Sequence, residues 1–266
     1  MRKIVGISQK IKRSWMDAVL DHLVQTDDEA ELRVFLDEYL KADLPGKESR
    51  AKAAGIVLRI WSGCDLWRRA LQLLPRISGR ERIWLHWGMA ALAYPFFRDT
   101  AEVVGRLQTL QDDFTTAQAQ ARMLTAWGDR STNKEAVQKL ITSMLDWEVL
   151  QATKTKGRFV TAPRLTTDIM DLQLWLLEAL LTASAADEIE VQHLLRLPAL
   201  FPFRITASLA DLRRNERFTI HRQGLNMDMA ALSKINAESR PTSVMPLRKS
   251  NAAERSQLSL FSKQGK

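Results

Sequence analysis

Residue types that carry out catalysis are present in this chain of 266 residues, but they are not spaced for it. The four histidines are far apart, and none has a cysteine or carboxylate at metal-ligand spacing. They are His22, His86, His193 and His221. No glycine-rich phosphate loop, Gly-x-Ser-x-Gly turn or His-Glu-x-x-His helix occurs. Adjacent acids such as Asp112 and Asp113 stand at the ends of expected helices, where solvent exposure explains them. We therefore expect a protein that is not an enzyme and holds no cofactor or metal ion.

Side chains suited to nucleic-acid contact concentrate in residues 115–165, which carry eight basic and four acidic side chains. A helix in the major groove presents its outward N-terminal side chains to bases and phosphates, and a neighbouring hairpin can add cations. On a helix over 132–146, the predicted DNA contacts are Thr132, Asn133, Lys134, Gln138 and Thr142. On the hairpin that follows, they are Lys154, Lys156 and Arg158. Lysine-rich hairpin tips are also common as plain solvated surface, so a protein-binding role stays open.

Two capped helices and a hairpin are needed to position these side chains. Residues 115–118 (Thr-Thr-Ala-Gln) have the form of a capping box, and Gly128 supplies a left-handed stop to the helix that follows. Residues 132–135 (Thr-Asn-Lys-Glu) repeat the capping-box form and predict the next helix. The hydrophobic period then changes to that of strands over 148–153 and 158–161. Helix, helix, short turn, helix and hairpin is the order of a winged helix-turn-helix.

The remainder of the chain is predicted to be mainly helical. Its first hundred residues show wide apolar stripes at helical spacing, rich in Trp and Leu, which are typical of a packed core. A second hairpin is expected around Gly224, either in a second winged helix or packed against the first. The predicted fold class is therefore mainly α: a helical N-terminal bundle, a winged helix-turn-helix, a second β-hairpin and a disordered tail. The expected domains are 1–99, 100–165 and 166–235, followed by the tail 236–266.

Charge and composition favour a polyanionic partner over a membrane. The net charge of +8 is unevenly distributed: segments 1–13, 115–165 and 238–266 carry +5, +4 and +4, while 14–114 and 166–237 carry −3 and −2. The most apolar run, 83–97, is about fifteen residues long, whereas a membrane-spanning helix needs roughly twenty. It is predicted to be a core helix, with His86 as a hydrogen-bonded core residue. A single cysteine, Cys64, excludes an intrachain disulfide framework. We expect a cytoplasmic protein without membrane contact.

The polar segment from residue 236 onward contains one apolar cluster. Residues 257–261 read Gln-Leu-Ser-Leu-Phe, which resembles the pentapeptide by which bacterial polymerases and repair proteins hold the sliding clamp. In that interpretation Gln257 forms a hydrogen bond at the rim of the clamp pocket, while Leu258, Leu260 and Phe261 fill an apolar groove. A disordered tail is a suitable carrier for such a linear motif. Docking of this cluster onto the protein's own body is the alternative.

Over residues 45–232 the chain resembles the small accessory protein A of BREX bacteriophage-exclusion systems. The matching patterns are Ser49–Ala54, Arg80–Leu85, Trp127, Ser131–Thr132, Leu140, Met144–Leu145, Val149–Leu150, Leu200–Phe203, Leu212, Phe218 and Gly224. The resemblance implies a small DNA-binding component without a known active site, with a helical half related to antitermination-factor folds. It supplies no contact residues, and the basic N-terminus and clamp-like tail depart from the family pattern.

The sequence thus predicts a non-catalytic DNA-binding accessory protein of a bacterial phage-defence or DNA-transaction system. Its winged helix would bind duplex DNA, and other defence proteins and the sliding clamp would be partners. The alternatives are a protein–protein adaptor or an RNA-binding factor in the same kind of complex.

Overall fold

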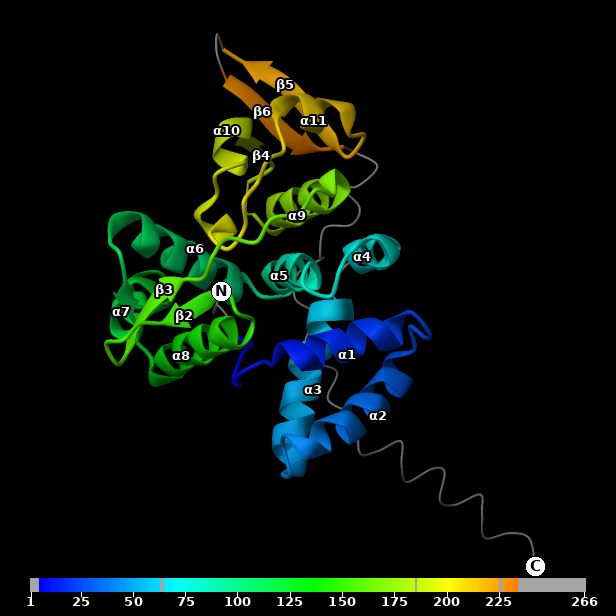
Figure 1. The fold of residues 1–266 in the computed structure, drawn as a ribbon, viewed down its shortest axis with the longest axis vertical. Helices are drawn as coiled ribbons and strands as arrows, with labels where there is room; N and C mark the ends of the chain where they lie inside the picture. Colours follow the sequence, from blue (N-terminus) through cyan, green and yellow to red (C-terminus); the bar gives the residue numbers. More distant parts are fainter. Residues whose placement is uncertain (1–4, 63–64, 185, 225–226, 234–266) are drawn as a thin grey trace, which may run out of the picture.

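A computed structural model describes residues 5–62, 65–184, 186–224 and 227–233. They form a mostly helical structure with two small antiparallel sheets (Figure 1), which confirms the predicted fold class at that level. The predicted clamp-binding residues 257–261, the tail 236–266 and Cys64 lie outside the described residues. Within the described ranges, no helix combines the length and apolar character needed to cross a bilayer.

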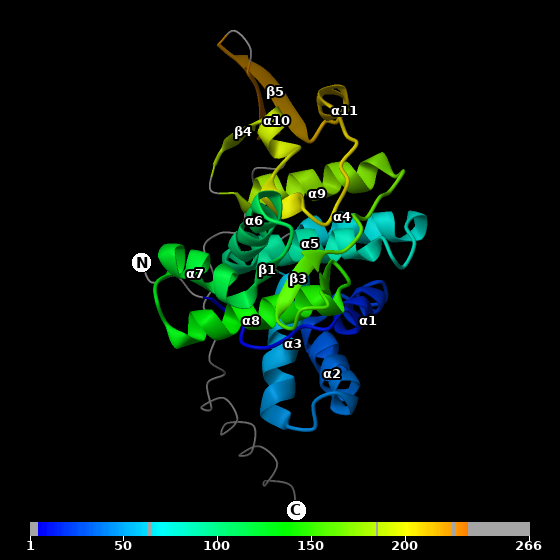
Figure 2. The ribbon, with the colours of Figure 1, turned by 60° about the vertical axis from the view of Figure 1, so that its left-hand side comes forward.

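Five helices build the N-terminal part of the molecule. They are α1 (Arg13–Leu23), α2 (Glu29–Tyr39), α3 (Lys47–Ser62), α4 (Leu66–Leu73) and α5 (Arg82–Ala93), with 3-10 turns η1 (Leu40–Ala42) and η2 (Leu74–Arg76). Helix α5 has no solvent-facing stripe, because every residue from Ile83 to Leu92 is buried. It packs against α1, α3, α4, α6 and α9 and so lies at the centre of the molecule (Figures 1 and 2). The core-helix prediction for this segment is confirmed, although a new helix begins at Pro95.

The next six elements, which we call unit A, pack around one small sheet. They are α6 (Pro95–Leu110), β1 (Phe114–Thr115), α7 (Thr116–Trp127), α8 (Ser131–Asp146), β2 (Leu150–Ala152) and β3 (Arg158–Thr161). The sheet order is β1-β3-β2, with both pairs antiparallel and Phe159 opposite Phe114 on one side and Ala152 on the other. The domain boundary expected between residues 99 and 100 falls inside α6, because Pro95 at the first helical position starts that helix earlier.

A second set of elements, unit B, repeats this order. It comprises α9 (Met170–Ala183), β4 (Glu188–Glu190), α10 (Val191–Leu194), η3 (Pro198–Leu200), α11 (Leu209–Arg214), β5 (Phe218–Gln223) and β6 (Met227–Leu232). Its sheet order is β4-β6-β5, so the last strand again lies between the other two. The predicted second hairpin is β5–β6, and Gly224 at its turn has a positive φ of 63°. Units A and B therefore share one chain order and one strand order.

One continuous core joins the N-terminal helices to both units. Helix α5 packs along α9 of unit B, and α6 of unit A packs along η3 of unit B. The indole N–H of Trp87 on α5 donates to the carbonyl oxygen of Ala199 in η3 at 3.0 Å. Because buried residues from all three parts belong to the same apolar cluster, the units are held in fixed positions by packing as well as by the chain.

Candidate nucleic-acid interface

Helix α8 carries the side chains that were predicted to contact DNA, and its start is defined by a turn after α7. The capping box predicted at 115–118 is present. Thr115 Oγ1 accepts a hydrogen bond from the backbone N–H of Gln118, and the side-chain oxygen of Gln118 accepts one from the backbone N–H of Thr115. Gly128 at the helix end has a positive φ of 89°, but its ψ of 150° lies outside the left-handed helical region that the predicted stop implies. The second predicted capping box, over 132–135, is wrong. Helix α8 begins one residue earlier, at Ser131, and Arg130 before it provides no side-chain cap.

Asn133 is a structural residue of that turn. Its side chain is 2% exposed, and its Nδ2 donates to the carbonyl oxygens of Trp127 and Gly128 at 3.0 and 2.8 Å. The prediction of Asn133 as a DNA contact is therefore corrected, because its amide closes the α7–α8 turn from inside. The spacing could have revealed this, since Asn133 lies four residues before Val137 and seven before Leu140, on the buried stripe of α8.

The other predicted residues of α8 lie on its solvent side. Thr132, Lys134 and Gln138 are exposed and Thr142 is half-buried. The ammonium group of Lys134 forms an ion pair with Asp129 at 2.8 Å. The Thr142 hydroxyl donates to the carbonyl oxygen of Gln138 at 2.8 Å, so its remaining capacity is that of an acceptor.

Sequence reasoning missed three further residues of the same exposed face. Ser131, Glu135 and Lys139 are all exposed and share this face of α8 with Gln138 and Thr142. Helical spacing alone would have placed them there. Glu135 puts one negative charge in the middle of the face, and Lys139 puts a positive charge beside it. Within the described residues neither side chain has a hydrogen-bond or ion-pair partner.

The β2–β3 hairpin ends in two exposed lysines. Lys154 and Lys156 form no ion pair within the described part of the chain. The turn between them is fixed by Thr153, whose hydroxyl donates to the carbonyl oxygen of Thr155 at 3.0 Å, and by Gly157, which has a φ of 79°. Arg158 differs from the lysines because its guanidinium pairs with Asp113 just before β1. The hairpin therefore offers two uncommitted cations and one that is shared.

The basic N-terminal segment is part of the fold where it is described. The backbone N–H of Ile11 donates to Ser143 Oγ at 2.9 Å, and the indole N–H of Trp147 donates to the carbonyl oxygen of Ile11 at 3.0 Å. Lys10 pairs with Asp146 at 2.7 Å, at the C-terminal end of α8. Lys12 and Arg13 are likewise paired, with Asp43 and Asp17. Of these three cations, only Lys10 pairs with a residue of α8.

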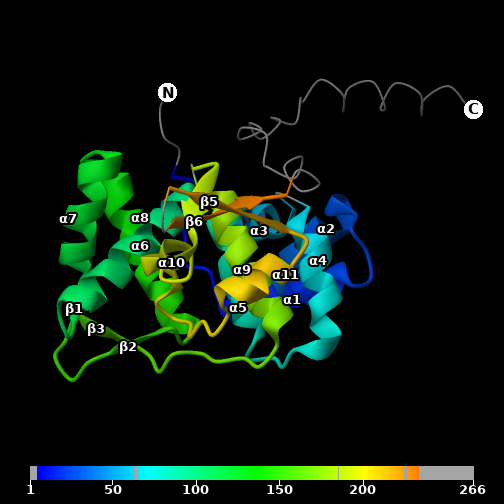
Figure 3. The ribbon, with the colours of Figure 1, turned by 90° about the horizontal axis from the view of Figure 1, so that it is seen from above.

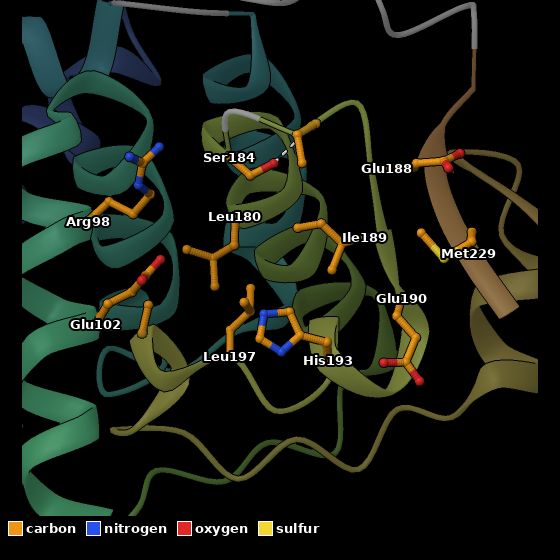
Figure 4. Close-up of a pocket in the computed structure, with 12 residues that line it drawn as sticks. Arg98, Glu102, Leu180, Ser184, Glu188, Ile189, Glu190, His193, Leu197 and Met229 are labelled. Carbon is orange, nitrogen blue, oxygen red and sulfur yellow. Dashed lines mark hydrogen bonds between the residues drawn. The ribbon is translucent and has the colours of Figure 1, made fainter. Parts of the chain in front are cut away.

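A cavity of about 350 Å³ lies between the two units and has the opposite charge character (Figure 4). Carboxylates line it from α6 (Glu102) and from β4 (Glu188 and Glu190), together with His193 of α10. The one arginine of its described lining, Arg98, already donates to Asp99 at 2.9 and 2.7 Å and to the carbonyl oxygen of Ala183. A cavity lined in this way repels phosphate, so it does not extend the interface formed by α8 and the hairpin.

Comparisons with known proteins identify no relative: no family model, no curated protein and no solved structure matches the chain. In the described residues no group of three or more His, Cys, Asp or Glu side chains is arranged to hold a metal ion.

Proposed function

We propose that the chain is a non-catalytic DNA-binding protein and that unit A is a winged helix whose α8 and β2–β3 hairpin contact duplex DNA. The support for the winged helix is the order of its elements: helix, strand, helix, helix and a hairpin, with the last strand central in the sheet. In this arrangement α8 is the recognition helix and the β2–β3 hairpin is the wing. Unit B has the same order and is proposed to be a second winged helix.

The observation that carries the DNA proposal is the uncommitted positive charge along this surface. Lys139 on α8 and Lys154 and Lys156 on the wing are exposed and have no carboxylate partner among the described residues. Five other described lysines have such a partner, namely Lys10, Lys12, Lys41, Lys52 and Lys134, whereas Lys47 on α3 has none. Free lysines on a helix and an adjoining hairpin suit phosphates on the two sides of a groove, while Thr132 and Gln138 offer polar groups to base edges.

The biological setting is proposed from the resemblance to accessory protein A of BREX systems. It supports a role in phage defence or another bacterial DNA transaction, with further proteins of that system as partners. The clamp-like pentapeptide at 257–261 would deliver the protein to replicating DNA. A purified sliding clamp should capture the native chain but not the variant with Leu260→Ala and Phe261→Ala. Equal capture of both would contradict that part of the proposal.

The experiment that tests DNA binding combines charge removal with a salt titration. The double variant Lys154→Gln and Lys156→Gln should bind duplex DNA more weakly, and its log Kd should depend less steeply on log salt, by about 0.9 per lost phosphate contact. The matched control is Lys47→Gln with Lys52→Gln, two exposed lysines of α3 on the N-terminal part. An equal effect of both pairs, or no duplex binding by the native chain at low salt, contradicts the proposal.

Binding experiments with the same native chain and variants distinguish two other functions. A protein–protein adaptor would bind its partner with little dependence on salt or on the wing lysines. An RNA-binding factor would prefer structured RNA when duplex DNA, single-stranded DNA and RNA compete for the native chain. A preference for duplex DNA in that competition supports the present proposal over both.

A further inference from the structure

A second cavity, of about 290 Å³, lies where the start of α5 meets the linker between β3 and α9. Four of its lining residues come from the first segment: Ser78, Arg80, Glu81 and Trp84. The others are Arg164, Leu165 and Thr166 of the linker. The linker is held in place by a pair of hydrogen bonds, from Leu165 N–H to the carbonyl oxygen of Pro202 at 2.8 Å and from Arg204 N–H to that of Leu165 at 2.9 Å.

The two arginines of this cavity have no partner within the described chain. Arg80 and Arg164 are exposed, and neither guanidinium forms an ion pair or a hydrogen bond there. Most other arginines near them are engaged: Arg76 pairs with Asp171 and Arg82 with Asp21. Guanidinium groups match phosphate oxygens in geometry and charge, so two free ones on one cavity are suited to that anion.

Trp84 supplies an independent observation on the wall of the same cavity. The residue is fully buried, and its indole nitrogen is a buried donor without a hydrogen-bond partner. Among the described residues, Trp61 and His86 hold the other buried side-chain nitrogens without a hydrogen-bond partner. Neither of them lines this cavity or the cavity between units A and B. Buried donors are rarely left unpaired, because an unmade hydrogen bond is costly. The indole nitrogen itself has almost no accessible surface, so Trp84 contributes its ring to the cavity wall rather than a donor that opens into the cavity.

The helix that starts at the cavity adds a further attraction for an anion. Helix α5 is 12 residues long, has no acidic residue in its first turn and is not capped by a side chain at Glu81. The N-terminus of such a helix carries free N–H groups and partial positive charge. The hydroxyl groups of Ser78 and Thr166 stand on the same lining.

The carboxylate of Glu81 is the one negative group of the described lining, and its oxygens are already engaged. One accepts from the backbone N–H and the hydroxyl of Ser78, both at 2.8 Å, and the other accepts from Thr167 Oγ1. Burial raises the pKa of Glu81, but the hydrogen bonds from Thr167 and Ser78 outweigh it and leave this pKa below its ordinary value. Glu81 thus fixes the loop, and the two arginines exceed its charge by one.

We propose that this cavity binds a phosphate group, with Arg80 and Arg164 as its charged ligands and Trp84 in its wall as a reporter of binding. The phosphate belongs either to a small phosphorylated molecule or to a nucleic-acid backbone. Figure 3 shows the linker along the same edge of the molecule as the β2–β3 hairpin. Arg80 and Arg164 are exposed, so either source can reach them. The proposal does not depend on α8 or on the wing lysines.

The indole N–H resonance of Trp84 in a ¹⁵N-labelled full chain provides a direct test. It is assigned with Trp84→Phe, or by through-bond assignment where that variant does not fold. At constant ionic strength, inorganic phosphate should move this resonance in a saturable way through the millimolar range, while chloride should not. The double variant Arg80→Gln and Arg164→Gln should weaken phosphate binding about tenfold or more.

The control is Arg33→Gln with Arg68→Gln, which removes the same charge from α2 and α4, away from the cavity. Phosphate affinity should be unchanged in this control. No saturable movement of the Trp84 resonance, or equal affinity in the cavity variant and the native chain, overturns the proposal.

Further arms of the titration identify the source of the phosphate. If a 5′-mononucleotide moves the Trp84 resonance and duplex DNA does not, the site binds small phosphorylated molecules. If duplex DNA moves the Trp84 resonance, and still does so in the double variant Lys154→Gln and Lys156→Gln, the site binds a phosphate of the DNA backbone. In that case failure of the wing proposal would leave the cavity proposal standing, so the two can be separated.

Discussion

Gly105 of α6 lies directly against Pro198 of η3, so that a Cβ atom built on this glycine would overlap the carbonyl oxygen of Pro198. This contact joins unit A to unit B, because α6 and η3 belong to different units and pack along one another. The neighbour is backbone and cannot rotate away as a flexible side chain could. The absence of a side chain at residue 105 therefore sets the distance between the two units.

We predict that Gly105→Ala lowers the free energy of unfolding by about 2 to 4 kcal/mol, because the added methyl group forces the two units apart. Chemical denaturation followed by circular dichroism measures this change. The control is Gly55→Ala on α3, where nothing lies within 4 Å of the place that a Cβ atom would take. Helix propensity should make Gly55→Ala neutral or stabilising by up to about 1 kcal/mol. Equal stability of both variants would show that α6 and η3 can separate without cost.

Local patterns were sufficient to predict α7, α8 and the β2–β3 hairpin of unit A. The capping box at Thr115, the positive φ at Gly128 and the β2–β3 hairpin all depend on residues that are close in sequence. The two short strands β1 and β4 were not predicted, because each has only two or three residues and is defined by pairing with a distant strand.

The surroundings of the candidate site depend on contacts that leave no local signal. Ile11 and Trp147 are 136 positions apart, yet their hydrogen bond brings the N-terminal segment onto the end of α8. Net charge alone suggested that Lys10, Lys12 and Arg13 were free for a ligand. In the fold each has a carboxylate partner, and only three-dimensional packing decides which cations remain available.

Asn133 should behave as a structural residue in mutagenesis. Asn133→Ala removes the donor to the carbonyl oxygens of Trp127 and Gly128 and leaves both turn acceptors without this partner. We expect a loss of about 1 to 3 kcal/mol in the free energy of unfolding. Asn133→Asp should be at least as destabilising, since a carboxylate cannot donate and its charge is costly in a buried site that faces two carbonyl oxygens.

Thermal denaturation compares these variants with Thr132→Ala, an exposed neighbour on the same helix that should change stability little. DNA affinity measured well below the melting temperature should be the same for Asn133→Ala and the native chain. A stable Asn133→Ala variant with selectively reduced DNA affinity would restore this residue as a DNA contact.

His86 on α5 makes the core sensitive to acid. Its Nε2 is 3.0 Å from Asp17 Oδ1, its Nδ1 has no partner within the described residues, and the ring is fully buried. Burial lowers the pKa of His86, and this effect outweighs the opposing effect of the neighbouring Asp17. The unfolded chain therefore binds the proton more readily than the folded one. The stability that His86 contributes as a neutral ring is present above about pH 6.5 and is lost as the pH falls below it, by up to about 1.4 kcal/mol per pH unit.

Urea denaturation at pH 7.5 and pH 5.5 measures this loss. In His86→Gln the amide can still donate to Asp17 but cannot be protonated, so the decrease in stability between the two pH values should be smaller than in the native chain. His193→Gln, at an exposed position, is the control and should retain the native decrease. Burial raises the pKa of Asp17, but the hydrogen bond from His86 and the positive charges of Arg13 and Arg82 outweigh it, so this pKa is also lowered. Its contribution is lost only as the pH falls below about 4, outside this window. Identical pH dependence in native and His86→Gln protein would contradict the assignment.

Glu135 provides the sharpest test of whether α8 faces DNA. It is an exposed acid in the middle of the proposed contact face, and no described cation neutralises it. If phosphates approach this face, Glu135→Gln removes a repulsion while keeping the size and polarity of the side chain. We expect duplex affinity to rise about threefold at low salt and the difference to shrink as salt increases.

The control is Glu31→Gln on α2, which removes the same charge from an exposed acid of the N-terminal part and should change affinity much less. Equal effects of the two variants would mean that only the total charge matters. A loss of affinity confined to one DNA sequence would instead show Glu135 accepting a hydrogen bond from a cytosine amino group, which places α8 in the major groove by a different observation.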